Sequence, residues 1–375
     1  MPIYLDGHAT TPIAPEARDA MMAAWHRVGN AGSPHSAGLH ASVSVDAGRA
    51  AVAKLIGADA SEVVFTSGAT EANNIAILGV AGRMGSADRP RIVVSAIEHK
   101  AVLEPARSLR SKGFDVVEAP VDRQGRIDLD VLRTLIDDRT LLVSIMAANN
   151  ETGVLQPVAE VAAIARKTGA LIHCDAAQAV GKLPLDVFEL DVDYLSLSAH
   201  KLYGPLGVGA LYVSAAAPRP NALVFGGGQE GGLRAGTLPA PLCVGFGVAA
   251  ELAARRLAAD AIHVHGLSER FLRGLKARHV SFSLTGGGAE RLPGSTSLMV
   301  EGIDGEQLVD KLGRDLHIST GSACNSGQIQ PSHVLRAMGL SSTEMKSSVR
   351  ILFGRYNSTE DAEAAAGLFA AACAA

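Results

Sequence analysis

Ser198, His200 and Lys201 lie together at the end of a short apolar run, 194–198. A lysine at the end of a buried strand can attack a carbonyl carbon and form a Schiff base when burial or a nearby cation lowers its pKa. The serine and the histidine beside it could bind a phosphate group. Taken alone, Lys201 reads more simply as an ordinary surface lysine, so its interpretation depends on the rest of the chain.

A carboxylate closes another apolar run, because Asp175 ends the stretch 170–175 and Gln178 follows three residues later. A buried carboxylate costs free energy unless it has a cationic partner. The protonated ring nitrogen of pyridoxal phosphate is such a partner, and its protonation makes the ring an electron sink. Gln178 could then bond the phenolic oxygen of that ring. An aspartate that caps the next helix is an equally good interpretation of Asp175 alone.

Two further stretches follow apolar runs. The small residues of 66–71, Ala69 and Thr70 among them, lead from the run 63–65 into a helical pattern. Backbone N–H groups at a helix start bind phosphate, although many capped helices look similar in sequence.

His99 follows the run 91–96, where it could lie over a cofactor ring and move protons. In isolation, a partly exposed loop histidine is the simpler interpretation.

The C-terminal third contains a candidate nucleophile and a candidate carboxylate-binding group. Cys324 lies among small and turn-forming residues in 321–327, which predicts an exposed, mobile loop. An exposed thiol is a candidate nucleophile, whereas structural cysteines prefer apolar surroundings. Arg350 is a lone cation in a neutral stretch and could bind a carboxylate through two parallel hydrogen bonds. The alternatives are a tolerated loop cysteine and an ordinary surface ion pair.

The elements that must position these residues are short apolar runs, rich in β-branched residues, as in buried parallel strands. The runs span 91–96, 141–146, 170–175, 194–198 and 209–213, with amphipathic stretches such as 101–112 and 158–168 between them. This alternation predicts an α/β fold with a mostly parallel sheet, whose right-handed crossovers bring the loops after the strands to one edge. We expect a large domain over 16–256 and a smaller α+β domain over 1–15 and 257–375, which contains Cys324.

Composition excludes several classes of protein. The 375 residues are 47% apolar, have a net charge of −4 and include only 4% aromatic side chains. The length favours two domains, and the charge and the few aromatic residues argue against binding to nucleic acid or to an anionic membrane. No apolar run is long enough to span a bilayer, and the four cysteines form no C-x-x-C pair. We therefore expect a cytoplasmic protein with reduced thiols and no metal site.

Taken in order, these motifs resemble the cysteine desulfurases, which belong to the class V aminotransferase-like proteins of fold type I. The resemblance runs from about residue 4 to about residue 356. Its most specific pieces are 9–12, 66–71, 98–100, 149–151, 175–178, 198–201, 234–237, 321–324 and 331–338. It implies pyridoxal 5′-phosphate as the cofactor, L-cysteine as the substrate and L-alanine as a product. The sulfur would pass to a cysteine of the enzyme and then to an acceptor protein, such as an iron–sulfur scaffold.

The resemblance also implies a role for each matched residue. The catalytic residues would be Lys201 as the Schiff-base lysine, His99 over the ring and Cys324 as the sulfur acceptor. The cofactor-binding residues would be Ala69, Thr70, His99, Asn150, Asp175, Gln178, Ser198, His200, Lys201 and Thr237, and the substrate-binding residues Asn150 and Arg350. Thr237 matches a family residue that reaches the phosphate of the neighbouring subunit, which implies a homodimer.

Some positions depart from the family pattern. Gly7 and His8 stand where an aromatic or asparagine-bearing pair is more typical, Leu206 where a basic residue is common, and Gly231 where arginine is frequent. Other reactions on the same cofactor remain alternatives, namely selenocysteine lysis, β-elimination and transamination. A scaffold protein without cofactor is an alternative from another class. The fate of the sulfur separates the first group, and the yellow colour of bound cofactor separates the second.

Overall fold

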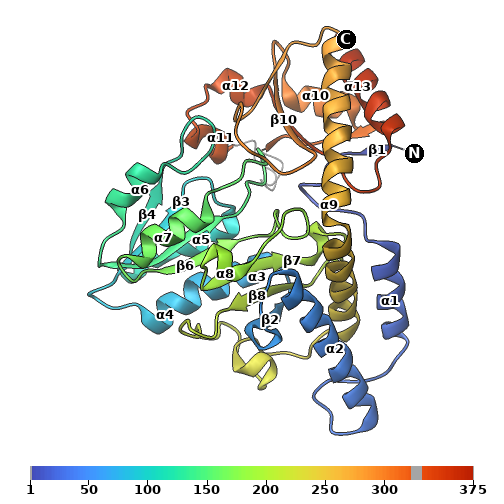
Figure 1. Ribbon diagram of the computed structural model, residues 1–375. Coiled ribbons are helices and arrows are strands. Elements are labelled where there is room, and N and C mark those ends of the chain that lie inside the picture. Colours follow the sequence, from blue (N-terminus) through green and yellow to red (C-terminus); the bar gives the residue numbers. More distant parts are fainter. Residues whose placement is uncertain (1, 322–331, 375) are drawn as a thin grey trace.

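The computed structural model describes residues 2–321 and 332–374 (Figure 1). The strands are β1 (Ile3–Tyr4), β2 (Val63–Thr66), β3 (Arg91–Ser95), β4 (Asp115–Ala119), β5 (Thr140–Met146), β6 (Leu171–Asp175), β7 (Tyr194–Ser198), β8 (Gly209–Val213), β9 (Phe282–Leu284), β10 (Ser295–Val300), β11 (Leu316–His317) and β12 (Ser348–Leu352). The α-helices are α1 (Pro15–Trp25), α2 (Ser36–Leu55), α3 (Ala69–Asn74), α4 (Val80–Met84), α5 (Lys100–Ser108), α6 (Leu129–Leu135), α7 (Val158–Arg166), α8 (Val187–Leu190), α9 (Ala240–Ala277), α10 (Gly305–Leu312), α11 (His333–Ala337), α12 (Ser342–Lys346) and α13 (Thr359–Ala374). Short 3₁₀ turns include η4 (Ala199–Lys201), and a π-helical turn, η2 (Ile75–Gly79), joins α3 to α4.

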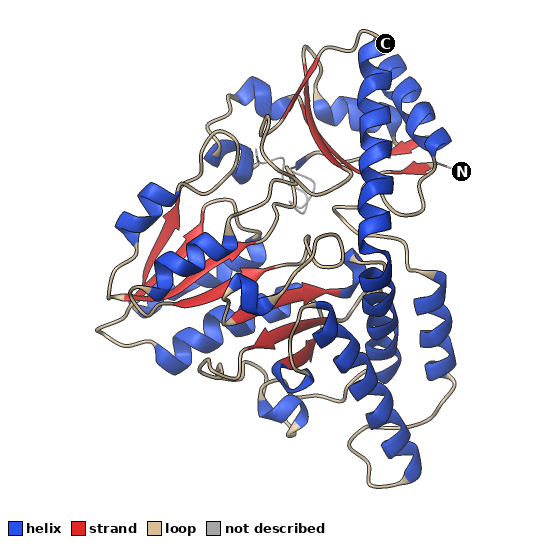
Figure 2. Ribbon diagram, in the orientation of Figure 1, coloured by secondary structure: helices blue, strands red, loops and turns tan. Residues whose placement is uncertain are grey.

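A seven-stranded sheet forms the centre of the described chain, in the order β2-β8-β7-β6-β5-β3-β4 (Figure 2). Neighbouring strands are parallel except at β8, which is antiparallel to both β2 and β7. Because β2 and β7 are both antiparallel to β8, β2 runs in the same direction as β7 and the other parallel strands. The α/β fold and the mostly parallel sheet expected from the sequence are therefore confirmed.

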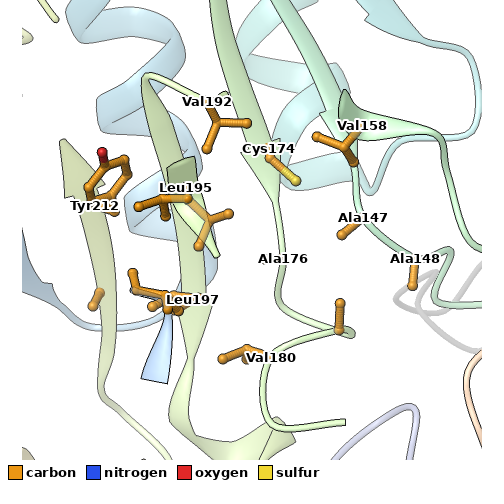
Figure 3. Packing of buried hydrophobic residues seen from close by; sticks show 14 of the residues in the cluster. Ala147, Ala148, Val158, Cys174, Ala176, Val180, Val192, Leu195, Leu197 and Tyr212 are labelled. Atoms are coloured by element: carbon orange, nitrogen blue, oxygen red, sulfur yellow. The ribbon is translucent and has the colours of Figure 1, made fainter. Parts of the chain in front are cut away.

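Alternate residues of each strand pack into two different cores. Val93, Ile145 and Leu197 belong to the core on one face, and Ile92, Val94 and Leu211 belong to the core on the other. Figure 3 shows part of the first core, where Leu195, Leu197 and Tyr212 pack near Val180 and Val192. Both faces are apolar because both are covered by helices, which explains why the strands read as continuous apolar runs.

The five strands expected from the sequence are all present, with ends that differ by at most one residue. Strand β4 was not expected. It lies at the edge of the sheet, and its sequence includes the charged residues Asp115 and Glu118. An edge strand need not be apolar on both faces, so a search for apolar runs misses it.

A third core lies above the sheet in Figure 1 and joins the two ends of the chain. It contains Leu5, Phe271 and Phe369, together with side chains of β10 and β12. Strand β1 pairs with β11, and β12, β10 and β9 form a separate three-stranded sheet. The 38-residue helix α9 packs against α1 and α2 with its first half and reaches α13 with its second half. The expected domain boundary at 256 falls inside α9, so the division into two domains stays a prediction.

The chain direction brings the ends of five strands to one edge of the central sheet. Strands β2, β3, β5, β6 and β7 are parallel to one another, so Thr66, Ser95, Met146, Asp175 and Ser198 all end there. The register confirms this at β8, where Gly209 pairs with both Thr66 and Ser198. In open α/β sheets, this is the edge at which ligands bind. Within the described ranges, no helix is long and apolar enough to cross a membrane.

Helices α2 and α9 cross with their backbones in contact, which requires glycine on both. A Cβ atom on Gly247 would lie 2.5 Å from the Cα atom of Gly48. We expect Gly247→Ala to lower the free energy of unfolding by about 1–3 kcal/mol, because the helices must move apart. Gly266→Ala in the same helix meets nothing within 4 Å and should stabilise the protein by up to about 1 kcal/mol. Urea unfolding of the two variants measures the difference, and equal effects would contradict the proposed contact.

Candidate active site

A cavity of about 410 Å³ opens at the strand-end edge of the central sheet. It is lined by most of the residues that the sequence singled out: Ala69, Thr70, His99, Asn150, Asp175, Gln178, Ser198, His200, Lys201 and Arg350. Thr237 does not line it and is exposed elsewhere on the chain. Cys324 lies outside the described residues. The structure therefore brings ten of the predicted residues to one cavity.

Lys201 ends the 3₁₀ turn η4 directly after β7. Its ammonium donates hydrogen bonds to the carbonyl oxygens of His8 and Ala9, the latter at 2.7 Å. Thr11 fastens the same N-terminal segment to this turn, since its hydroxyl donates to the His200 carbonyl oxygen at 2.9 Å. Lys201 is thus held at the cavity by backbone oxygens of a segment almost two hundred residues away in sequence.

Asp175 ends β6 and its carboxylate is buried. One oxygen accepts a 2.7 Å hydrogen bond from the side-chain amide of Asn73, and the other accepts a 2.9 Å bond from the Ala177 backbone N–H. The second bond closes a turn, and no helix begins there, since the next helix is α8 and Asp186 caps it, so the helix-capping alternative for Asp175 is wrong. Asp175 lies in the cavity wall with both carboxylate oxygens held by these two donors.

His99 caps α5 and lies at the cavity wall. Its Nδ1 atom accepts a 3.1 Å hydrogen bond from the Ala101 backbone N–H, so the neutral ring carries its proton on Nε2. Burial lowers the pKa of His99, although the nearby Asp175 carboxylate acts in the opposite direction. A neutral His99 therefore keeps one N–H for a proton transfer in the cavity.

The start of α3 forms a backbone cradle in the same wall. The N-cap residue is Gly68, whose missing side chain leaves the first N–H groups of the helix without a side-chain cap. A Cβ atom on Gly209, the first residue of β8, would lie 2.6 Å from the Cα atom of Gly68. The start of β8 and the turn before α3 therefore lie in close contact. The Ser198 hydroxyl lies 3.9 Å from where a side chain on Gly68 would begin. Uncapped N–H groups beside a hydroxyl form a site suited to phosphate.

Arg350 lies in the middle of β12 and is only 2% exposed, so the surface ion pair considered as its alternative is wrong. Its guanidinium pairs with the Asp6 carboxylate at 3.0 Å, donates to the Asn150 carbonyl oxygen at 2.9 Å and donates to the Ser319 hydroxyl at 3.1 Å. Those bonds use three of the five N–H groups of an arginine side chain. The cation is therefore fixed in place and still has donors for a ligand.

The model of the family described as aminotransferase class-V matches residues 3–365. The chain belongs to the aminotransferase class-V family. Among curated relatives of this class-V chain, cysteine desulfurase IscS of Rickettsia massiliae is 43% identical over 371 residues, which cover 98% of this chain and 90% of the relative.

Solved structures agree with the family assignment. A NifS-like protein superposes on this class-V chain with a TM-score of 0.92 at 37% identity, and the match covers all of both chains. SspA, solved in complex with cysteine, superposes with a TM-score of 0.82 at 35% identity over 95% of this chain and 99% of that one. The fold type I architecture expected from the sequence is confirmed by these likenesses.

Sequence reasoning missed several residues at the cavity of this class-V protein. Asn73 lies one helical turn after Ala69, so its i, i+4 spacing was a usable signal. His8 was noted only as a departure from the family pattern, yet it is buried in the cavity wall. Lys182 does not line the cavity, but it donates to the carbonyl oxygen of Gln178, which does, at 2.9 Å. Desolvation of its ammonium, followed by repulsion from Lys201, lowers the pKa of Lys182 to about 7.

A buried histidine of β6, two residues before Asp175, makes stability depend on pH. His173 lies between the hydroxyls of Ser144, at 2.7 Å, and Ser196, at 3.0 Å, and burial lowers its pKa to about 4. Between about pH 6.5 and pH 4 the unfolded chain binds a proton at this residue that the folded chain does not bind. The free energy of unfolding should therefore fall as the pH falls through this window.

The variant His173→Gln keeps two hydrogen-bonding groups and removes the titration. We expect its free energy of unfolding to depend less on pH than that of the wild type between pH 6.5 and pH 4, by up to about 1.4 kcal/mol per pH unit. Denaturant unfolding at several pH values measures both slopes. Above pH 7 the two slopes should agree, and equal slopes throughout would show that His173 is not the group responsible.

Proposed function

We propose that this class-V protein is a pyridoxal-phosphate-dependent cysteine desulfurase, which converts L-cysteine to L-alanine and transfers the sulfur to Cys324. The observation that supports this most is that a lysine, a buried carboxylate, a neutral histidine and a buried arginine meet in one cavity. The relatives named as cysteine desulfurases support the same reaction.

The residues present fit the cofactor. The N–H groups at the start of α3, with Ser198 and His200, would hold the phosphate; burial and the Lys201 ammonium lower the pKa of His200 to about 4, so it would do so as a neutral donor. Asp175 would pair with the ring nitrogen. Asn150 has a buried side-chain oxygen with no partner among the described residues, as expected for an atom that meets a ligand. When bound, pyridoxal phosphate supplies an aldehyde that bonds to amines and a ring that accepts electrons from the substrate carbon.

Side chains of the protein would attach the cofactor, transfer protons and orient the substrate. The Lys201 amine would attach the cofactor and, once displaced by the substrate amine, take the proton from the substrate α-carbon. Asp175, held by Asn73, would keep the ring nitrogen protonated. His99 would lie over the ring and move protons through Nε2. The free N–H groups of Arg350 would bind the substrate carboxylate and, with Asn150, set its orientation.

The sulfur transfer balances without any other reactant. The Cys324 thiolate attacks the substrate sulfur, the bond between that sulfur and the β-carbon breaks, and the carbon takes up a proton. One L-cysteine and one thiol give one L-alanine and one persulfide. The persulfide would then pass to an acceptor protein, with an iron–sulfur scaffold as one candidate. A reducing compartment such as the cytoplasm suits a free nucleophilic thiol, and we propose that location.

Cys324→Ser tests the sulfur acceptor. A serine hydroxyl stays protonated near neutral pH, whereas a few per cent of an ordinary thiol is thiolate, so the variant should not take up sulfur. It should still bind pyridoxal phosphate and still change the absorption spectrum when L-cysteine is added, but form no persulfide and little alanine. Spectral titration, alanine measurement and protein mass test this.

Cys373→Ser is the matched control, because Cys373 lies in α13 and is not in the cavity. It should retain full activity. Full alanine production by the Cys324 variant would remove Cys324 from the mechanism. Free sulfide and pyruvate from the wild type would indicate β-elimination instead.

We also propose that the protein acts as a homodimer with shared sites. Thr237 is exposed and outside its own cavity, as expected of a residue that serves the partner subunit. Large apolar side chains are exposed around the cavity and on the segment before Thr237: Leu206 is 68% exposed and Phe225 is 86% exposed. Covering them in a subunit interface would remove apolar surface from water.

Mixing two inactive variants tests the shared sites. Lys201→Ala lacks the lysine and Thr237→Ala lacks the residue offered to the partner subunit. A hybrid dimer would have one site with both changes and one with neither, so up to about half of the hybrids' sites should be active. The measurement is alanine formation after subunit exchange, verified by mass spectrometry of tagged chains. If verified hybrids stay inactive, Thr237 does not act across the interface.

A further inference from the structure

His8 is a buried histidine whose ring and carbonyl oxygen are both engaged at the cavity. It follows β1, is 1% exposed and lines the cavity. Its Nδ1 atom lies 3.2 Å from Oε1 of Gln178, and its Nε2 atom lies 2.8 Å from the hydroxyl of Ser295 in β10. Its carbonyl oxygen accepts hydrogen bonds from Gln178 Nε2, at 2.9 Å, and from Lys201.

The two contacts with Gln178 fix the orientation of its side-chain amide. A carbonyl oxygen only accepts, so the Gln178 atom bonded to the His8 carbonyl must be the NH₂ group. The Gln178 oxygen then faces His8 Nδ1 and must accept from it, which places the ring proton on Nδ1. His8 Nε2 therefore accepts from the Ser295 hydroxyl. Reversing the amide would put two acceptors together at the His8 carbonyl and would lose that bond, whichever tautomer the ring adopts.

The His8 ring remains neutral in this network. Burial, followed by the positive charge of Arg350, lowers its pKa well below the usual value for histidine. The nearby Lys182 and Lys201 are also cations and lower the pKa of His8 in the same direction. A neutral ring is what the network requires, because His8 must donate at one nitrogen and accept at the other.

The fixed orientation of the Gln178 amide determines which of its hydrogen-bonding groups can contact a ligand. Its oxygen is turned to His8, and one of its two N–H groups is used by the His8 carbonyl, so the second N–H is the group left for the cavity. A donor fixed in this way favours a ligand oxygen that carries negative charge over one that carries a proton. In pyridoxal phosphate the atom of that kind on the ring is the phenolic oxygen.

We propose that His8 is a positioning residue: its imidazole locks the Gln178 amide with an N–H toward the cavity and so strengthens binding of the deprotonated phenolic oxygen of pyridoxal phosphate. This inference rests on the proposed function. It adds a side chain that bridges β10 of the third core and the loop after β6. Because the Lys201 contact is made by the His8 backbone, side-chain substitutions leave that bond available.

The test compares two ligands on two variants. His8→Leu removes both ring bonds, whereas His8→Asn keeps an amide N–H near the Nδ1 position but does not extend to Ser295. The ligands are pyridoxal phosphate and its 3-deoxy analogue, which lacks the phenolic oxygen. Dissociation constants are measured on apo-protein by equilibrium dialysis, with no turnover involved, and thermal unfolding checks that each variant is folded.

We expect His8→Leu to weaken pyridoxal phosphate binding by about 5- to 10-fold. This is the effect of losing one well-oriented hydrogen bond, here the bond from Gln178 to the phenolic oxygen. It should weaken binding of the 3-deoxy analogue by less than about 2-fold. His8→Asn should bind pyridoxal phosphate within about 2-fold of the wild type, because a donor to the Gln178 oxygen is restored. A general packing defect would instead weaken both ligands equally.

The outcomes separate this inference from the proposed function. If wild-type apo-protein fails to bind pyridoxal phosphate, the proposed function is wrong. If the wild type binds it but His8→Leu binds both ligands like the wild type, or loses both equally, the positioning role of His8 is wrong. Gln178→Ala should match His8→Leu in its ligand preference, and adding His8→Leu to Gln178→Ala should cost little more, since both act through one amide.

Discussion

Arg350 is a buried cation, and the arrangement of the chain around the cavity depends on satisfying it. Breaking a buried ion pair by removing one partner typically costs about 3–5 kcal/mol. The partners of Arg350 come from three separate segments, namely Asp6 near the N-terminus, Ser319 after β11 and the carbonyl oxygen of Asn150 after β5. Satisfying this one guanidinium therefore brings the third core, the N-terminal segment and the central sheet together, and the cavity lies where they meet.

Burial acts on the histidines of the cavity in a common direction. The pKa values of His8, His99 and His200 are all lowered, with burial as the largest cause in each case. Neutral imidazoles can donate and accept at the same time, which a cation cannot. The positive charge of the cavity is then left to lysine and arginine side chains. This division suits a ligand with an anionic phosphate and a substrate with a carboxylate.

Much of the fold and site could be predicted because the relevant signals are local. Each strand that leads to the cavity is an apolar run, and Asp175, Ser198 and Lys201 follow from their places at strand ends. What could not be predicted depends on partners far away in sequence. His8 meets Gln178 and Ser295 only after three segments have packed, and no local pattern marks that meeting. The full length of α9 was also missed: the expected domain boundary at 256 falls inside it, because one helix packs against elements of both parts of the chain.

The pairing of His8 with Ser295 has a consequence for the order of events during synthesis. The two residues are 287 positions apart. At about 5–20 residues added per second, Ser295 joins the chain roughly 15 to 60 s after His8. The seven central strands lie between Val63 and Val213, so they can pair while the ribosome is still adding β10 and β12. During that interval a nascent chain already contains Lys201 and Gln178, which bond the His8 carbonyl oxygen, but it lacks Ser295 for the His8 ring and Arg350 for the Asp6 carboxylate. The cavity is completed by the first and last parts of the chain together, so a prematurely released chain would leave it open on that side.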